Sequence, residues 1–301
     1  MDNSVKSAGE YWSSRSSSAE TIKPKSSAWY ISEKFVQYAN FKASGVLSSK
    51  YGDGFFQLIS RELTKTKANL GISIGGGDGK KEMRLIQDGF VDKFEIYEAS
   101  EVRIAQGKEL AAKLGISSEV TFHLVSGNEF PKERKYDLVY WDSALHHMPN
   151  VIEALAWSKE ILNENGLLAV NEYVGPNRFQ WSQASLLVCD DFRKALPERF
   201  FISSDGRKLS RQTPRINVQQ LIKQDPTEAQ DSERIIEAIS SIFPKAKISP
   251  IGGAFYHIGL RGILQNFLYP EDYHYLDIAL ILDSLLENNG DYHFSVAIYR
   301  K

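Results

Sequence analysis

The chain has 301 residues, of which 42% are apolar and 25% charged, and its formal net charge is −2 at pH 7. This composition is ordinary for a globular protein, and the near-neutral charge argues against a protein that binds nucleic acid through its phosphates. Cys189 is the single cysteine in the sequence, which excludes an intrachain disulfide.

The N-terminal region is polar. No apolar stretch of the chain approaches the roughly 20 residues of a membrane span, and the N-terminus lacks the apolar core of a secretory signal. We therefore expect a cytoplasmic protein without a membrane partner. Residues 1–28 are rich in serine and lysine and favour a mobile leader, although the aromatic residues Trp12, Trp29 and Tyr30 suit docking on the body of the protein. Residues 28–41 and 54–67 have the pattern of helices.

From residue 69 onward, short apolar runs alternate with amphipathic segments. The predicted strands lie at 69–74, 93–98, 120–125, 136–141 and 167–172. The predicted helices lie at 79–89, 101–114 and 151–162, with Gly166 as the C-cap of the last helix. This alternation predicts an α/β fold with a doubly wound, mostly parallel sheet preceded by N-terminal helices.

Residues 176–245 interrupt this alternation with several prolines among short helical patterns. We interpret them as a helical cap inserted after the fifth strand, above the carboxyl ends of the strands, where ligands bind. Further candidate strands lie at 246–249, 256–258 and 293–299, the last of them antiparallel, and a helix is predicted at 263–287. The expected organisation is one domain over 29–301.

A glycine cluster follows the first strand. Leu70–Ile74 is short and apolar, and Gly75-Gly-Gly-Asp-Gly79 comes directly after it. Glycines allow positive φ and let the backbone pass close to a ligand, and the next helix opens with free N–H groups. Glu98 ends the second strand, 21 residues after Gly77, where a carboxylate can accept hydrogen bonds from ribose hydroxyls. The pattern indicates a nucleotide-like cofactor.

The glycine spacing does not fit a dinucleotide. The fingerprint G-x-G-x-x-G would need a third glycine at Lys80 or Glu82, depending on the register. Residues 70–172 instead resemble the core of the class I S-adenosylmethionine-dependent methyltransferases, which have a Rossmann-like, seven-stranded sheet. The matching stretches are Ile74-Gly-Gly-Gly-Asp-Gly79, Tyr97-Glu-Ala-Ser100, Val125-Ser-Gly-Asn-Glu-Phe130, Tyr136-Asp-Leu-Val-Tyr-Trp-Asp-Ser-Ala-Leu-His-His-Met148 and Leu162-Asn-Glu-Asn-Gly-Leu-Leu168.

The resemblance implies a cofactor site for S-adenosyl-L-methionine and its product S-adenosyl-L-homocysteine. Glu98 would hold the ribose hydroxyls, and Asn128 would accept from the adenine amino group. The family often has an acid just before the glycines, where this chain has Ser73 or Ile74. The full set of implied cofactor residues is Gly75, Gly76, Gly77, Asp78, Gly79, Glu98, Ala99, Asn128 and Asp142.

Polar residues after the fourth and fifth strands suit the methyl acceptor. His146 and His147 follow the fourth strand, and either could act as a general base near neutral pH or serve to position or pack. Glu172 ends the fifth strand and is the third catalytic candidate. Tyr173, Arg178, Trp181 and His257 are the candidate substrate-binding residues. No metal site is predicted, because nothing in the spacing of Asp142, Glu172 and His257 demands one.

The sequence favours a methyltransferase that acts on a small polar acceptor, most readily at oxygen. The stretches Glu172-Tyr-x-Gly-Pro-x-Arg-Phe-Gln-Trp181 and Asp225-Pro-Thr-Glu-Ala229 resemble a bacterial subgroup associated with saccharides or other small metabolites. Two alternatives remain open: a non-catalytic, cofactor-binding partner subunit and a nicotinamide-dependent oxidoreductase. Modification of a protein or nucleic acid is a weaker option, and the sequence is compatible with a homodimer.

Overall fold

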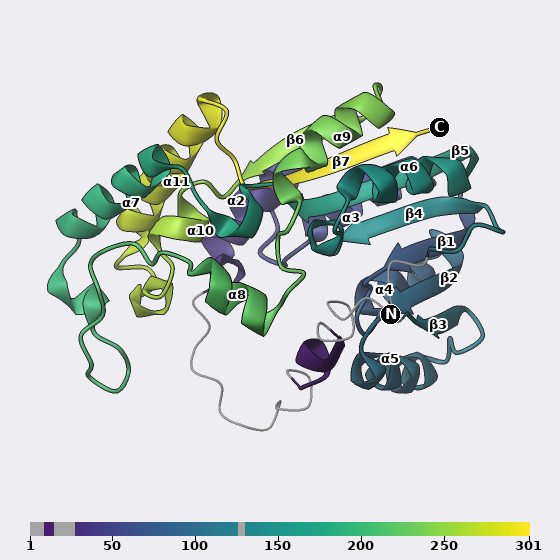
Figure 1. Cartoon of the computed structure of the whole chain (residues 1–301), viewed down its shortest axis with the longest axis horizontal. Helices are drawn as coiled ribbons and strands as arrows, with labels where there is room; N and C mark the ends of the chain where they lie inside the picture. Colours follow the sequence, from purple (N-terminus) through teal and green to yellow (C-terminus); the bar gives the residue numbers. More distant parts are fainter. Residues whose placement is uncertain (1–8, 15–27, 126–129) are drawn as a thin grey trace.

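The computed structural model describes residues 9–14, 28–125 and 130–301, which fold around a seven-stranded sheet (Figure 1). The strand order in space is β3-β2-β1-β4-β5-β7-β6. The strands are β1 (Ala68–Ile74), β2 (Val91–Glu98), β3 (Val120–Leu124), β4 (Tyr136–Asp142), β5 (Leu162–Tyr173), β6 (Lys247–Gly252) and β7 (Phe294–Arg300). Strands β1 to β5 run parallel, whereas β7 is antiparallel to β5 and β6. The predicted fold class is confirmed.

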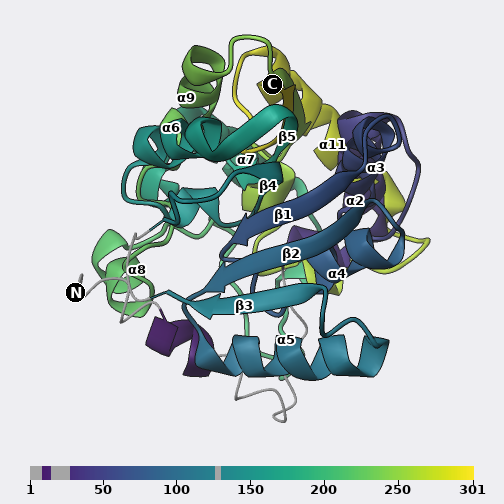
Figure 2. The same cartoon turned by 90° about the vertical axis from the view of Figure 1, so that its right-hand side faces the viewer.

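Helices cover both faces of the sheet (Figure 2). They are α2 (Glu33–Ser44), α3 (Asp53–Leu63), α4 (Lys80–Gln87), α5 (Glu101–Leu114), α6 (Val151–Ile161), α7 (Gln183–Ala195), α8 (Val218–Gln224), α9 (Ile235–Ile242), α10 (Tyr256–Gly259) and α11 (Tyr273–Asn288). None of these helices is long and apolar enough to cross a bilayer, within the part of the chain that the structure describes.

Strand β4 shows why the sheet needs two helical layers. Its side chains alternate between the two faces, and both faces are buried. Leu138 and Tyr140 pack into the apolar cluster that contains α2, α3 and α4. Val139 and Trp141 pack into the cluster that contains α6 and α9. A continuous apolar run of this kind is therefore stable only as a central strand.

The segment between β5 and β6 is helical, as expected of an insertion. Helix α7 packs against α10, whereas α9 packs against α6 on the face of the sheet. Figure 2 shows the arrowheads of β1 to β3 pointing toward the side where α8 and the short helix of residues 9–14 lie. Ligand sites in such sheets form beyond the carboxyl ends of the strands. The domain limits 29–301 stay a prediction.

The predicted C-cap at Gly166 is wrong. Helix α6 ends at Ile161, and the chain enters β5 at Leu162, which already has extended backbone angles. The residue with positive φ is Asn165, at +64°, and Gly166 lies within the strand. Asparagine tolerates the left-handed region better than most residues, so the chain does not need glycine for this turn.

The predicted strand at residues 256–258 is also wrong, because this segment is helix α10. Gly252 and Gly253 have φ of +86° and +99° and turn the chain at the end of β6. The N–H groups of Gly253 and Phe255 then donate to the buried carboxylate of Asp283, over 3.0 and 2.8 Å. Short apolar runs look alike in buried strands and buried helices, so periodicity alone misassigns them.

The last predicted helix is shorter than expected. Residues 264–266 form only a 3₁₀ turn, and α11 begins at Tyr273. Pro270 lies between them, and a proline disfavours helical geometry in the residue before it. The predictions of a strand at 246–249 and an antiparallel strand at 293–299 are confirmed by β6 and β7.

A buried carboxylate attaches α4 to β1 below the glycine turn. Oε1 of Glu82 accepts a hydrogen bond from the Ser73 hydroxyl over 2.6 Å. A Cβ at Gly76 would lie within 2.9 Å of that same oxygen, so only glycine fits above it. Oε2 of Glu82 is buried and has no hydrogen-bond partner among the described residues. Burial raises the pKa of Glu82 from 4.5 to about 7.

This shift makes stability depend on pH. The unfolded chain releases the Glu82 proton near pH 4.5, whereas the folded protein holds it to about pH 7. The folded state therefore binds more protons in this window, and stability falls as the pH rises through it. We expect the Glu82→Gln variant to lose this pH dependence. Between pH 5 and pH 8, its free energy of unfolding should therefore rise by about 2–3 kcal/mol relative to that of the wild type.

Urea unfolding at both pH values, followed by circular dichroism, measures this difference. Glu160→Gln, at an exposed position on α6, is the matched control and should follow the wild type. A Glu82→Gln variant whose stability changes with pH in parallel with the wild type would contradict the raised pKa.

Candidate functional site

A cavity of about 260 Å³ opens at the carboxyl ends of β1, β2 and β4. Gly75, Glu98 and Ala99 line one end of it, and His146 and Glu228 line the other. A second, adjoining hollow of about 620 Å³ lies over the glycine turn. Strands β1 and β4 are neighbours at the point where the strand order reverses, which is where open α/β sheets bind their ligands.

Glu98 holds the glycine turn in place. Its side chain is buried, Oε2 accepts the N–H of Gly77 over 2.9 Å, and Oε1 accepts the N–H of Ser100 over 2.8 Å. Gly75 and Gly77 have φ of +66° and +62°, so the turn itself requires glycine. A carboxylate has about four acceptor sites, so both oxygens of Glu98 can still accept bonds from a ligand in the cavity.

Asp142 lines the hollow over the glycine turn, and three neighbouring side chains hold its carboxylate. Oδ1 lies 2.8 Å from Nζ of Lys81 and accepts a bond from the Asn171 amide over 2.9 Å. Oδ2 accepts a bond from the Tyr140 hydroxyl over 2.8 Å. Burial lowers the pKa of Lys81, but the Asp142 carboxylate outweighs it and the pKa is raised. Nothing local in the sequence indicates this ion pair, because Lys81 lies far from Asp142 along the chain.

The remaining cofactor candidates fall in three places. Gly76 and Asp78 line the hollow over the turn, and Asp78 forms an ion pair with Lys80 over 2.8 Å. Gly79 is the left-handed N-cap of α4, with φ of +71°. Asn128 lies outside the described residues, so its predicted contact with adenine stays a prediction.

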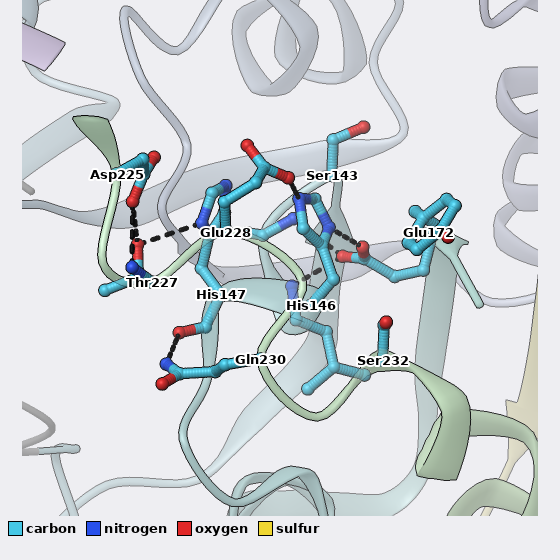
Figure 3. A network of polar contacts seen from close by, with 12 residues as sticks. Ser143, His146, His147, Glu172, Asp225, Thr227, Glu228, Gln230 and Ser232 are labelled. Carbon is cyan, nitrogen blue, oxygen red and sulfur yellow. Dashed lines mark hydrogen bonds and ion pairs between the residues drawn. The ribbon is translucent and has the colours of Figure 1, made fainter. Parts of the chain in front are cut away.

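His146 lies between two carboxylates at the other end of the cavity (Figure 3). Its Nδ1 is 2.6 Å from Oε2 of Glu172, and its Nε2 is 3.5 Å from Oε1 of Glu228. Burial alone would lower the pKa of His146, but the Glu172 carboxylate outweighs it, so the pKa is raised. The ring of His147 lies 4.2 Å from that of His146, between centroids.

Glu172 lies behind His146 and is not among the residues that line the cavity. Its side chain is 1% exposed, and Oε1 accepts the N–H groups of Ala144 and Leu145 over 2.7 and 2.6 Å. The carboxylate therefore fixes the turn after β4 and orients the imidazole of His146. In this geometry Glu172 positions His146 and does not line the cavity, and its catalytic role stays a prediction.

His147 is oriented by a second acid, through a threonine. Nδ1 of His147 lies 3.0 Å from Oγ1 of Thr227, and that hydroxyl donates to Oδ1 of Asp225 over 2.6 Å. An ionised carboxylate only accepts, so the threonine proton points to Asp225 and its oxygen accepts from Nδ1 of His147. Nε2 is then the unprotonated nitrogen of the neutral ring. Burial and the nearby His146 lower the pKa of His147.

Sequence reasoning did not assign Thr227 and Glu228 to the site. Both line the cavity, and they belong to the stretch 225–229 that resembles a bacterial subgroup. That resemblance was the only indication in the sequence that this stretch belongs to the site. It does not show which residues of the stretch face the histidines. Arg178 fixes the loop by donating to the backbone oxygen of Glu228 over 2.8 Å.

The four predicted substrate-binding residues do not line the cavity. Tyr173 and Trp181 are buried, and the Tyr173 hydroxyl donates to the backbone oxygen of Pro176 over 3.1 Å. The ring of His257 contacts both of them, with centroids 6.0 and 5.7 Å away. Together with Arg178, which contacts the backbone of Glu228, these residues form a packed group of side chains at the end of β5.

Residues 9–14 form a short helix at the cavity, where Trp12 is one of the lining residues. The guanidinium of Arg103 lies 4.3 Å above the Trp12 ring, and His147 meets that ring edge-on at 5.9 Å. The hydroxyls of Ser13 and Ser100 are 2.8 Å apart. These contacts confirm that an aromatic residue of the N-terminal region docks on the body of the protein.

The comparisons with known proteins agree with this arrangement. A family model described as a methyltransferase domain matches residues 70–230, more than half of the chain. A search of curated proteins finds no match.

Several solved structures share the fold. Geranyl diphosphate C-methyltransferase from Streptomyces coelicolor A3(2) has a TM-score of 0.54 at 9% identity, over 99% of this chain and 98% of that chain. Phosphoethanolamine N-methyltransferase 2 from Haemonchus contortus has a TM-score of 0.51 at 12% identity, over 90% of this chain and 57% of that chain. The (4+2)-cyclase SpnF has a TM-score of 0.50 at 13% identity, over 98% of this chain and 93% of that chain.

At such identities the solved structures show the fold alone, and one fold can carry different reactions. The family is shown by the sequence match, which includes the glycine turn, Glu98 and the histidine pair. The chain belongs to the class I S-adenosylmethionine-dependent methyltransferases.

Proposed function

We propose that this methyltransferase transfers the methyl group of S-adenosyl-L-methionine to a hydroxyl oxygen of a small polar molecule, such as a saccharide. The observation that carries the proposal is the single cavity between Glu98 and the histidine pair. One end presents a carboxylate and backbone groups suited to the cofactor, and the other presents side chains that accept protons.

The cofactor would lie against Gly75, Glu98 and Ala99 in the cavity and against Gly76 to Asp78 in the adjoining hollow. Glu98 would accept both ribose hydroxyls with the lone pairs that its backbone partners leave free. The glycine turn lets the methionine part lie close to the backbone. The hollow over Gly75, Gly77 and Asp142 would hold that part, with Lys81 at its edge.

The acceptor end consists of His146, His147 and Glu228. Methyl transfer is an in-line displacement, so the protein must align the acceptor with the sulfonium, which can reduce the barrier by roughly 7–11 kcal/mol in favourable cases. A hydroxyl must also lose its proton. The cluster offers acceptor atoms held in fixed orientation by Glu172 and Thr227, which suits a hydroxyl as the methyl acceptor.

A substrate panel tests the proposal directly. The protein is incubated with methyl-labelled S-adenosyl-L-methionine and with sugars, hydroxy acids, carboxylic acids and amines, and products are identified by mass spectrometry. We expect a methyl ether from a hydroxylated compound. Transfer only to nitrogen or carbon would reject the oxygen acceptor, and no transfer to any class would favour a binding subunit. A cytoplasmic location and a homodimer stay predictions.

The first variant tests the cofactor end. We expect Glu98→Ala to weaken binding of S-adenosyl-L-homocysteine about 10- to 100-fold, because a hydrogen bond to a charged acceptor contributes about 1.5–3 kcal/mol. Isothermal titration calorimetry measures the affinity. Glu101→Ala, at an exposed position on α5, is the control and should bind as the wild type does. Equal affinities for the wild type and a folded Glu98→Ala protein would place the ribose elsewhere.

The second pair of variants tests the acceptor end. We expect His146→Ala and His147→Ala to leave cofactor affinity within about twofold of the wild type, while at least one lowers turnover by about 10²–10⁴, the usual contribution of a positioned base. Steady-state kinetics with the acceptor found in the panel measures turnover. His274→Ala, at an exposed position on α11, is the control. Full turnover in both cavity variants would mean that alignment alone drives the reaction.

A further inference from the structure

Three side chains at the acceptor end of the cavity converge like metal ligands. His146, His147 and Glu228 each offer one ligand atom, and these atoms all lie within 4.8 Å of one another. The histidines come from the turn after β4, and Glu228 comes from the insertion after β5. Figure 3 shows both rings and the Glu228 carboxylate turned toward one another. We propose that these three residues bind one divalent transition-metal ion.

The spacing is close to what coordination needs. Bonds of about 2.0–2.2 Å from nitrogen and oxygen place neighbouring ligand atoms roughly 3.0–3.5 Å apart around a metal. Nε2 of His146 already lies 3.5 Å from Oε1 of Glu228. The ligand atom of His147 lies within 4.8 Å of the other two and must approach them to roughly 3.5 Å or less, which rotation of a side chain supplies.

The groups behind the histidines support the same interpretation. Each Nδ1 has a hydrogen-bond partner on the side away from the cluster. The partner of His146 is Glu172, and the partner of His147 is Thr227, which in turn donates to Asp225. Metal-bound histidines almost always donate the other ring N–H to a carboxylate or a similar acceptor, which fixes the tautomer and the ring orientation. Both rings are therefore set to present Nε2 to the ion, and Glu228 supplies a carboxylate oxygen.

The ligand set indicates the class of metal. Two imidazoles and one carboxylate suit Zn²⁺, Fe²⁺ and related first-row ions, whereas Mg²⁺ and Ca²⁺ prefer oxygen ligands throughout. Three protein ligands also leave coordination positions open for a substrate. This set of ligands differs from Asp142, Glu172 and His257, whose spacing in the sequence demands no metal. Asp142 pairs with Lys81, and Glu172 lies behind His146.

A metal here would explain how the acceptor becomes reactive, a consequence that rests on the proposed function. The acceptor hydroxyl binds the ion, which lowers the pKa of that hydroxyl as it does for bound water. The O–H bond breaks and the proton passes to solvent. The oxygen lone pair then forms the O–CH₃ bond, while the C–S bond breaks and its electron pair stays on the sulfur of S-adenosyl-L-homocysteine.

Metal binding can be measured without any substrate. Protein without a histidine tag is stripped with a chelator and titrated with Co²⁺, monitored by visible absorption, and with Zn²⁺, monitored by calorimetry. We expect one ion per chain, loss of binding in His147→Ala and Glu228→Ala, and affinity about 10- to 100-fold weaker in Glu172→Gln, the usual effect of losing an outer partner. His274→Ala should bind as the wild type does. Absence of one-to-one binding, or equal binding by all variants, would overturn the site.

Activity assays separate this inference from the proposed function. Loss of methyl transfer after chelation, with recovery on adding the ion, supports the metal's part in the reaction. Full activity of the stripped protein would overturn that part and leave the histidines as the base. One-to-one binding of the ion without methyl transfer to any hydroxyl compound would reject the proposed function and leave the metal site standing.

Discussion

Each half of the cavity depends on one buried carboxylate, which accepts hydrogen bonds from backbone N–H groups of a neighbouring turn. Glu98 does so at the end of β2, where it holds the glycine turn, and Glu172 does so at the end of β5, where it holds the turn after β4. Buried carboxylates are stable only with such partners, so each acid fixes the backbone around it. The two ends of the cavity depend on these two anchors.

The two anchors differ in what they leave available. Glu98 lines the cavity and keeps lone pairs free for a ligand. Glu172 is almost fully buried, and its second oxygen is taken by His146. Glu98 is therefore available to a ligand, whereas Glu172 orients an imidazole. The histidines have partners from further along the chain, because the insertion brings Thr227 and Glu228 against them.

The packing at the end of β5 explains why the four predicted substrate-binding residues do not line the cavity. Tyr173, Trp181 and His257 pack on one another, and Arg178 donates to the backbone of Glu228. Aromatic and arginine side chains after a strand look like substrate contacts in a sequence. Here their apolar surface packs at the strand end, and the arginine satisfies a carbonyl of the loop that carries Glu228.

The sequence by itself determined the sheet, the glycine turn and Glu98, because strand periodicity and the length of one βαβ unit fix these positions locally. It also placed His146 and His147 at the correct strand end. Only the tertiary structure decided that Glu172 orients His146, that Lys81 pairs with Asp142 and that Glu228 joins the histidines. These pairs are distant along the chain, and their contacts depend on how the insertion and the helices pack. Local backbone preferences do not specify contacts between residues so far apart in the sequence, whereas the packing of buried polar groups does.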